Sequence, residues 1–245
     1  MNINILMYTF FHISFYLMTW KAIDYKISLS KFNHLTGYKR KYVIKNLVKC
    51  FCLSIWSPIA LFVIKDAIFN DKWDNSQLHI VGSFYSINDL LGLILVRGLP
   101  LATKLHHICV VILGIVNILT DYTEVSVWRA CIIYGAFSIL SFSVNGYMGL
   151  RYITENDAIS QLRLCRVALI SLIIYLCCFI LNWIYHYNLL FTLENNLCSF
   201  IYFTMAHLVM YDDIKLIKHL YEKSLYLLKV GNAENGLAST KSSTE

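Results

Sequence analysis

Charged residues and proline are scarce in this sequence. Only 15% of the 245 residues are charged, 58% are hydrophobic, and there are two prolines. Soluble domains typically carry about 25% charged and 45–50% apolar residues. This imbalance argues against an ordinary soluble domain. It predicts an integral membrane protein whose helices form one bundle.

Metal-binding cysteine motifs and glycosylation sequons are also missing. None of the eight cysteines forms a Cys-x-x-Cys pair, and no Asn-x-Ser/Thr triplet occurs. Cysteines inside apolar runs behave as small hydrophobic residues, which argues against a disulfide framework or a zinc site. The spaced histidine clusters of di-iron membrane enzymes are not found either. We therefore expect no bound metal or resident cofactor.

Apolar runs and charged loops alternate along the chain. A membrane span needs roughly 20 apolar residues, so about seven spans fit. We expect an all-α polytopic fold with spans at residues 3–20, 43–64, 79–97, 103–120, 127–150, 165–187 and 196–211. The Lys- and Arg-rich loops alternate with acidic ones, which places the N-terminus outside and the C-terminus in the cytosol. The net charge of +6 then reports orientation, and no nucleic-acid partner is expected.

The chain divides into three segments. Residues 1–40 hold the first span and a basic cytosolic loop, and residues 41–225 form the main transmembrane domain. Residues 226–245 are small and polar, so we expect a disordered cytosolic tail. Apolar residues and lysines recur at helical spacing across 214–229. This pattern fits either an amphipathic helix on the membrane surface or a plain continuation of the last span.

The most informative stretch is 83–111, which reads as two spans joined by a short turn. Asp89 precedes Gly98 by nine residues and His107 follows it by nine. In an antiparallel hairpin both should lie at one depth, about 10–13 Å from the turn at 1.5 Å per residue. Ionisable residues inside a membrane are costly and usually mark a function. The carboxylate and histidine are therefore expected to meet.

A histidine beside a carboxylate suits general-base chemistry, because the carboxylate can fix the tautomer of the imidazole. His106 and His107 point about 100° apart on a helix. One is expected to face the site, and the other to orient it or bond a neighbouring helix. Asn145 and His207 are expected at the same depth from other spans. The alternative is that these polar groups only join the helices by hydrogen bonds.

The segment Ser86-Ile-Asn-Asp89-Leu, a short turn and then Leu105-His106-His107-Ile108 resembles the TLC-domain family. This family includes the ceramide synthases and other lipid-handling proteins of the endoplasmic reticulum. The resemblance covers roughly residues 40–225. The longer synthase signature after the histidine pair is absent here, and a Glu-x-Ser-x-Pro-Phe-x-Asn pattern remains only as Ser141–Asn145. The resemblance is therefore to a divergent member outside the synthases.

The resemblance implies a helical bundle around a lipid-sized cavity in the endoplasmic reticulum membrane. The implied catalytic residues are His106, His107 and Asp89. The expected substrate-binding residues are Ser86, Asn145 and His207. The implied co-substrate is acyl-CoA and the implied partner is a membrane lipid or acyl chain, while a homo-oligomer stays open.

Two functional hypotheses follow. The first is transfer of an acyl chain from acyl-CoA to a lipid amine or hydroxyl, with a histidine as base. The alternative is a non-enzymatic lipid-binding, lipid-sensing or trafficking protein that uses the same cavity. A seven-span receptor is the weakest option, because receptor motifs are missing and the ionisable groups lie towards the cytosol.

Overall fold

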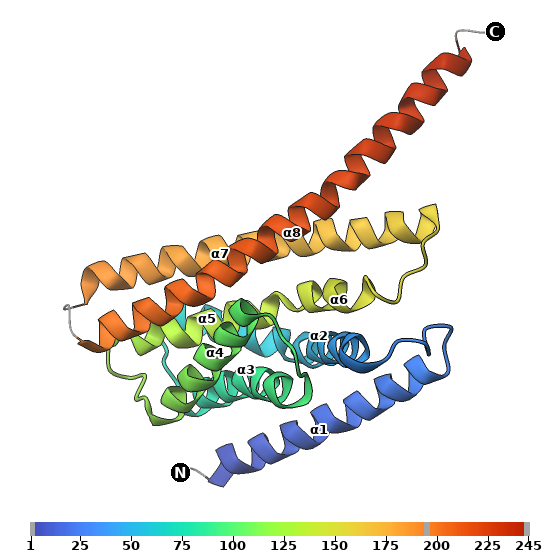
Figure 1. The fold of residues 1–245 in the computed structure, drawn as a ribbon. Helices are drawn as coiled ribbons and strands as arrows, with labels where there is room; N and C mark the ends of the chain where they lie inside the picture. The colour runs from blue at the N-terminus through green and yellow to red at the C-terminus, as the bar shows by residue number, and fades with distance from the viewer. Residues whose placement is uncertain (1–2, 194–196, 243–245) are drawn as a thin grey trace.

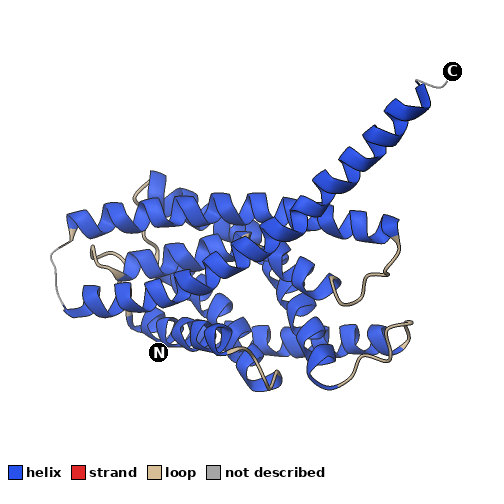
Figure 2. Ribbon diagram, turned by 45° about the horizontal axis from the view of Figure 1, so that its top comes forward, coloured by secondary structure: helices blue, strands red, loops and turns tan. Residues whose placement is uncertain are grey.

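The fold is all-helical, as the computed structural model shows for residues 3–193 and 197–242. Helix makes up 84% of the structure, and this part of the chain contains no strand (Figure 2). Side chains are described for residues 6–193 and 197–225. The expected all-α class is confirmed. The helices are α1 (Ile3–Ser28), α2 (Gly37–Ile64), η1 (Lys65–Phe69, a π-helical turn), α3 (Asn75–Leu95), α4 (Leu101–Leu119), α5 (Trp128–Leu140), α6 (Phe142–Leu150), α7 (Ala158–Thr192) and α8 (Leu197–Ser242).

Four or five of the described segments are long and apolar enough to cross a membrane. The four are α2 with η1, α3, α4 and α7, and the bent pair of α5 and α6 would be the fifth. They correspond to the second to sixth expected spans. The first and seventh expected spans fall in α1 and α8, whose described residues do not meet the same criterion of length and composition. These helices support a membrane protein. The number of seven spans stays a prediction.

Helix α2 lies at the centre of the bundle. It packs against α1, α3, α5 and α6, while α3 pairs with α4 and α7 pairs with α8 (Figure 1). Helix α8 crosses α7 and continues past the bundle as one helix to Ser242, so residues 214–229 extend the last helix. The tail expected to be disordered falls at residues 226–245, whose side chains lie outside the described residues, and that expectation stays a prediction.

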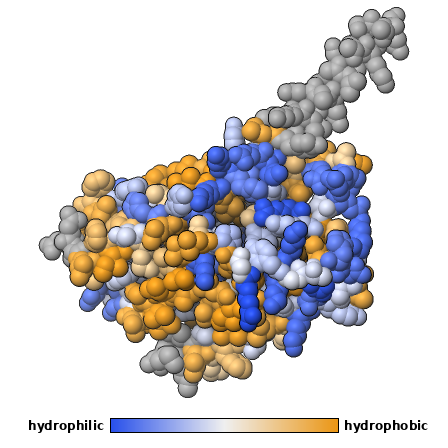
Figure 3. Space-filling view, viewed as in Figure 1, coloured by the Kyte–Doolittle hydropathy of each residue, from blue (hydrophilic) through white to orange (hydrophobic). Residues whose placement is uncertain are grey.

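The surface is apolar along the bundle and polar at one end. Hydrophobic side chains cover much of the visible face, and hydrophilic ones gather towards the α1–α2 and α6–α7 loops (Figure 3). A row of large apolar side chains on α7 is roughly half exposed: Ile170, Ile173, Ile180, Leu181 and Ile184. Contiguous exposed apolar surface of this kind is typical of a face turned to lipid. The distribution therefore agrees with a helix bundle embedded in a membrane.

Both ends of the α3–α4 hairpin are fixed by local chemistry. In the turn, Gly98 has a φ of +88°, which glycine adopts without steric cost. At the other end, Asn75 donates to Asp121 at 2.7 Å and accepts from the backbone N–H of Tyr122 at 2.7 Å. Hydrogen bonds from Asn75 and Thr123 lower the pKa of Asp121 to about 2. These contacts hold the register of the hairpin that carries the expected site.

Small residues let α3 and α4 approach closely. A Cβ atom added at Gly114 of α4 would overlap Cβ and Oγ of Ser86 on α3. A Cβ atom at Gly82 of α3 would lie 2.5 Å from the amide group of Asn117 on α4. Close approach at small residues is the usual basis of tight helix packing in membranes. Ser86 is thus a packing residue of this crossing.

We predict that Gly114→Ala destabilises the protein by about 1–3 kcal/mol, the usual cost of overpacking a tight contact. The matched control is Gly135→Ala, whose new Cβ would meet only Cδ1 of Tyr85, at an ordinary 3.9 Å. Thermal unfolding of the purified protein in detergent measures both variants. Equal unfolding temperatures for the two variants would contradict the close crossing of α3 and α4.

Candidate functional site

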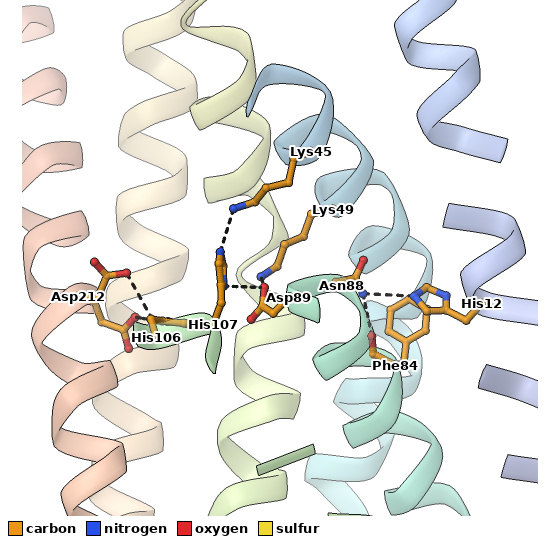
Figure 4. A network of polar contacts seen from close by, with 10 residues as sticks. His12, Lys45, Lys49, Phe84, Asn88, Asp89, His106, His107 and Asp212 are labelled. Atoms are coloured by element: carbon orange, nitrogen blue, oxygen red, sulfur yellow. Dashed lines mark hydrogen bonds and ion pairs between the residues drawn. The ribbon is translucent and has the colours of Figure 1, made fainter. Parts of the chain in front are cut away.

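Four buried ionisable side chains meet where α2, α3 and α4 adjoin. Lys45 and Lys49 lie one turn apart on the same face of α2, opposite Asp89 of α3 and His107 of α4 (Figure 4). Asp89 is fully buried, and Lys45 is only 3% exposed. Buried charges are costly unless they are paired. Their mutual contacts therefore decide what this cluster can do.

The four side chains form one continuous chain of contacts. Lys49 pairs with Oδ1 of Asp89, and Nδ1 of His107 lies 3.1 Å from the same oxygen. On its other side, Nε2 of His107 lies 2.9 Å from Nζ of Lys45. A lysine ammonium only donates, so Nε2 accepts, and the proton of a neutral ring then sits on Nδ1, facing Asp89. Nε2 of His107 is therefore hydrogen-bonded, whereas Nδ1 faces Asp89 at ion-pair distance without a hydrogen bond.

His106 faces a different pair of carboxylates. Its Nδ1 lies 3.5 Å from Oδ2 of Asp212 and 3.9 Å from Oδ1 of Asp213, both on α8. The planes of the two histidine rings stand at 80° to one another. Within the described residues, no hydrogen bond reaches Nε2 of His106. Each histidine thus faces its own carboxylate, and within the described residues His106 makes no hydrogen bond through either nitrogen.

Asp213 ties α8 to two further helices. Its Oδ1 accepts a hydrogen bond from the Tyr175 hydroxyl of α7 at 2.6 Å. Its Oδ2 accepts from the Tyr134 hydroxyl of α5 at 3.3 Å. These bonds satisfy a buried carboxylate and fix the part of α8 that carries Asp212. The carboxylate beside His106 is therefore held by the packing of α5, α7 and α8.

A pocket of about 270 Å³ opens in front of the histidines. Its volume is close to the low end of small-molecule sites, which start near 300 Å³. The bent pair of α5 and α6 turns by 46° at its break, and both helices line the pocket through Ser138 and Asn145. Broken helices at membrane depth normally line cavities. The other polar or charged lining residues are Tyr42, Lys45, Asn46, Lys49, Tyr85, Thr103, His106, His107, Tyr134, Ser141, Arg151, Tyr175, Asp212, Asp213, Lys215 and His219.

The structure brings some of the expected site residues together and separates others. His106, His107 and Asn145 line the pocket, with Asp89 buried behind His107. Ser86 does not reach it, because its hydroxyl donates to the Ser83 carbonyl at the α3–α4 crossing.

His207 lies elsewhere on α8. Its Nδ1 donates to the Phe203 carbonyl at 2.7 Å, and its ring centroid is 5.5 Å from that of Trp183. His207 was expected in the site because of its depth along the span, but depth does not decide which way the side chain points. The structure therefore assigns it no contact with the cluster.

Sequence reasoning missed two lysines and two aspartates. Lys45 and Lys49 lie four residues apart in the expected span 43–64, yet neither was among the expected site residues. That spacing within an apolar run is the signal that could have indicated an inward-facing pair. The adjacent acids Asp212 and Asp213 directly follow the last expected span, 196–211, and were not among the expected site residues.

Three side chains of the cluster are of the types that bind metal ions in proteins. Ligand atoms of Asp89, His106 and His107 all lie within 4.8 Å of one another. However, the ammonium groups of Lys45 and Lys49 already contact His107 and Asp89. A divalent cation would face two positive charges at short range. The arrangement fits proton transfer better than metal binding.

We predict that Asp89→Leu destabilises the protein by about 3–5 kcal/mol, because it leaves the Lys49 charge buried without its partner. The double variant Asp89→Leu/Lys49→Met should recover most of that loss. Denaturant unfolding in detergent measures both. Asp24→Asn is the control, since its pair with Arg40 at 2.6 Å is partly exposed and should contribute under about 1 kcal/mol. A double variant no more stable than the single one would refute the pairing.

Comparison with known proteins adds no assignment to this geometry. No protein-family model, curated protein or solved structure matches the chain. The family resemblance of the Asp89 to His107 segment stays a hypothesis.

Proposed function

We propose that this chain is a divergent TLC-type protein of membrane lipid metabolism. It has seven spans in the endoplasmic reticulum membrane, with its pocket open to the cytosol, and transfers an acyl chain from acyl-CoA to a lipid amine or hydroxyl. The cytosolic position suits a charged, water-borne donor. The all-helical apolar bundle and the Asp89, His106 and His107 cluster support this proposal.

The observation that carries the proposal is the environment of His106. This side chain lines the pocket and has Asp212 behind its Nδ1 at 3.5 Å. A carboxylate at that nitrogen fixes the tautomer that leaves Nε2 able to accept a proton. Such an arrangement is what a general base requires, and distances of this size often shorten when substrate binds.

The reaction would proceed as an acyl transfer at the thioester carbonyl. Nε2 of His106 takes the proton from the attacking N–H or O–H group while the new bond to the carbonyl carbon forms. The tetrahedral intermediate then collapses, the carbon–sulfur bond breaks, and the thiolate leaves with the proton returned by His106. No redox step or bound metal is needed.

Lys45 is the group best suited to stabilise negative charge on the intermediate. It lines the same pocket and donates to Nε2 of His107 at 2.9 Å. A fixed cation in a site of low dielectric stabilises a developing oxyanion more strongly than water does. His107 and Asp89 then act as positioning residues that hold this ammonium.

The second candidate function is the holding of a lipid without catalysis. It is favoured by the internal pairing of Lys45, His107, Asp89 and Lys49, because a fully paired polar chain also serves as structural glue between helices. In that case, the apolar lining residues Val144, Met148 and Leu216 would dominate binding. Replacing His106 would then alter little.

We predict that cells expressing the wild-type chain accumulate one acylated lipid class that cells expressing His106→Ala/His107→Ala lack. Loss of a general base reduces turnover by about 10²–10⁴-fold. Comparative lipidomics at matched expression measures this effect. His106→Ala alone should be as defective as the double variant, and Asp212→Asn should show a smaller loss.

The control is His34→Ala, because His34 is exposed in the loop after α1, where its contacts are local, with the Lys31 carbonyl at 3.1 Å and the Phe32 ring at 6.3 Å. It should match wild type. Size-exclusion profiles confirm that each variant folds. Equal lipid profiles for wild type and the double variant would overturn acyl transfer. Retained lipid in the purified double variant would then favour the holding function.

A further inference from the structure

Arg151 is a cation in the pocket wall that has no acidic partner. It follows the last residue of α6, and among the described residues no carboxylate oxygen lies within ion-pair distance of its guanidinium. All of its contacts are to neutral groups. Nη1 donates to Nε2 of His219 at 2.8 Å, and Nη2 donates weakly to the hydroxyls of Tyr42 at 3.4 Å and Tyr152 at 3.3 Å. Its Nε is buried without a hydrogen-bond partner. No carboxylate among the described residues thus compensates its charge.

The same aromatic ring connects Arg151 to the histidine cluster. The guanidinium carbon of Arg151 lies 5.7 Å from the centroid of the Tyr42 ring, and Nζ of Lys45 lies 5.9 Å from it. Lys45 in turn contacts His107. Arg151 and Lys45 therefore border the same part of the pocket, with the Tyr42 ring between them. Neither has an ion pair with a carboxylate among the described residues.

The pocket is consequently polarised. Arg151 and Lys45 border one part, whereas Asp212 and Asp213 occupy the part beside His106. The planar fork of an arginine matches the oxygens of a phosphate and binds them by two parallel charge-assisted hydrogen bonds. A buried donor without a partner is costly and is normally satisfied by a ligand or water. An anion at Arg151 would satisfy both its charge and its free Nε.

We propose that Arg151, held by Tyr42 and His219, forms an anion subsite that binds a phosphate group of the ligand in this pocket. The subsite deepens the proposed acyl transfer by naming the charged group of the substrate. The phosphate comes either from a coenzyme A donor that arrives from water or from the headgroup of a phospholipid. The same guanidinium chemistry recognises both sources.

The test measures phosphate binding by the purified full-length chain in phosphatidylcholine nanodiscs. In one arm, free coenzyme A is titrated calorimetrically, so that phosphates are present without an acyl chain. In the other arm, phosphatidic acid is added to the nanodiscs and its retention is measured by native mass spectrometry. Binding in the first arm identifies the donor, and preferential retention in the second identifies a phospholipid.

We predict that Arg151→Gln weakens phosphate binding by about tenfold or more in the arm where wild type binds, the scale of a lost charge-assisted hydrogen bond. Arg151→Lys should be intermediate, since it keeps the charge but loses the fork. The matched control is Arg166→Gln, because Arg166 is exposed on α7 and does not line the pocket. It should bind like wild type.

Wild type that binds neither probe, or Arg151→Gln with wild-type affinity, would overturn the subsite. If Arg151→Gln fails to fold, Arg151→Lys decides, and unchanged affinity in that variant would equally refute recognition by the guanidinium. Phosphate binding that persists in His106→Ala/His107→Ala supports the subsite whether or not turnover is found. Binding without any acyl transfer would leave the subsite standing and remove the proposed reaction.

Discussion

The contact on which the rest of the structure depends is the ion pair between Lys49 and Asp89. Both side chains are buried in an apolar bundle, and neither charge could be left there alone without a large penalty. The pair therefore fixes the register of α2 against α3. Through His107, which contacts Asp89 and Lys45, the same network also fixes α4. Three helices are locked together at the depth of the pocket.

The remaining pocket wall is set by α8. Asp213 binds hydroxyls from α5 and α7, and this places the neighbouring Asp212 beside His106. Two adjacent histidines thus act in different settings. His107 bonds Lys45 through one nitrogen and faces Asp89 with the other, while His106 has a carboxylate on one side and the pocket on the other. In the proposed acyl transfer, His107 would be the positioning group of this pair and His106 the base.

The sequence predicts the α3–α4 hairpin well, because spacing along a helix gives depth. Asp89 and His107, each nine residues from Gly98, were expected at one level, and their contact at 3.1 Å confirms it. Rotation about the helix axis was harder to predict. Ser86 and His207 were selected by motif and depth, yet one faces a helix crossing and the other lies away from the pocket. Each residue turns about 100°, so depth alone cannot supply direction.

The sequence by itself determined the class of the molecule and the level of its polar cluster. Composition and run length decide whether a chain favours lipid or water, and the rise per residue converts spacing into depth. Only the tertiary structure decided which partners meet. Lys45 and Asp212 lie on helices far apart in the chain and Arg151 at the end of a third, and their approach depends on how those helices pack and rotate. That packing balances buried charge against close helix contact over the whole bundle, and no local pattern encodes it.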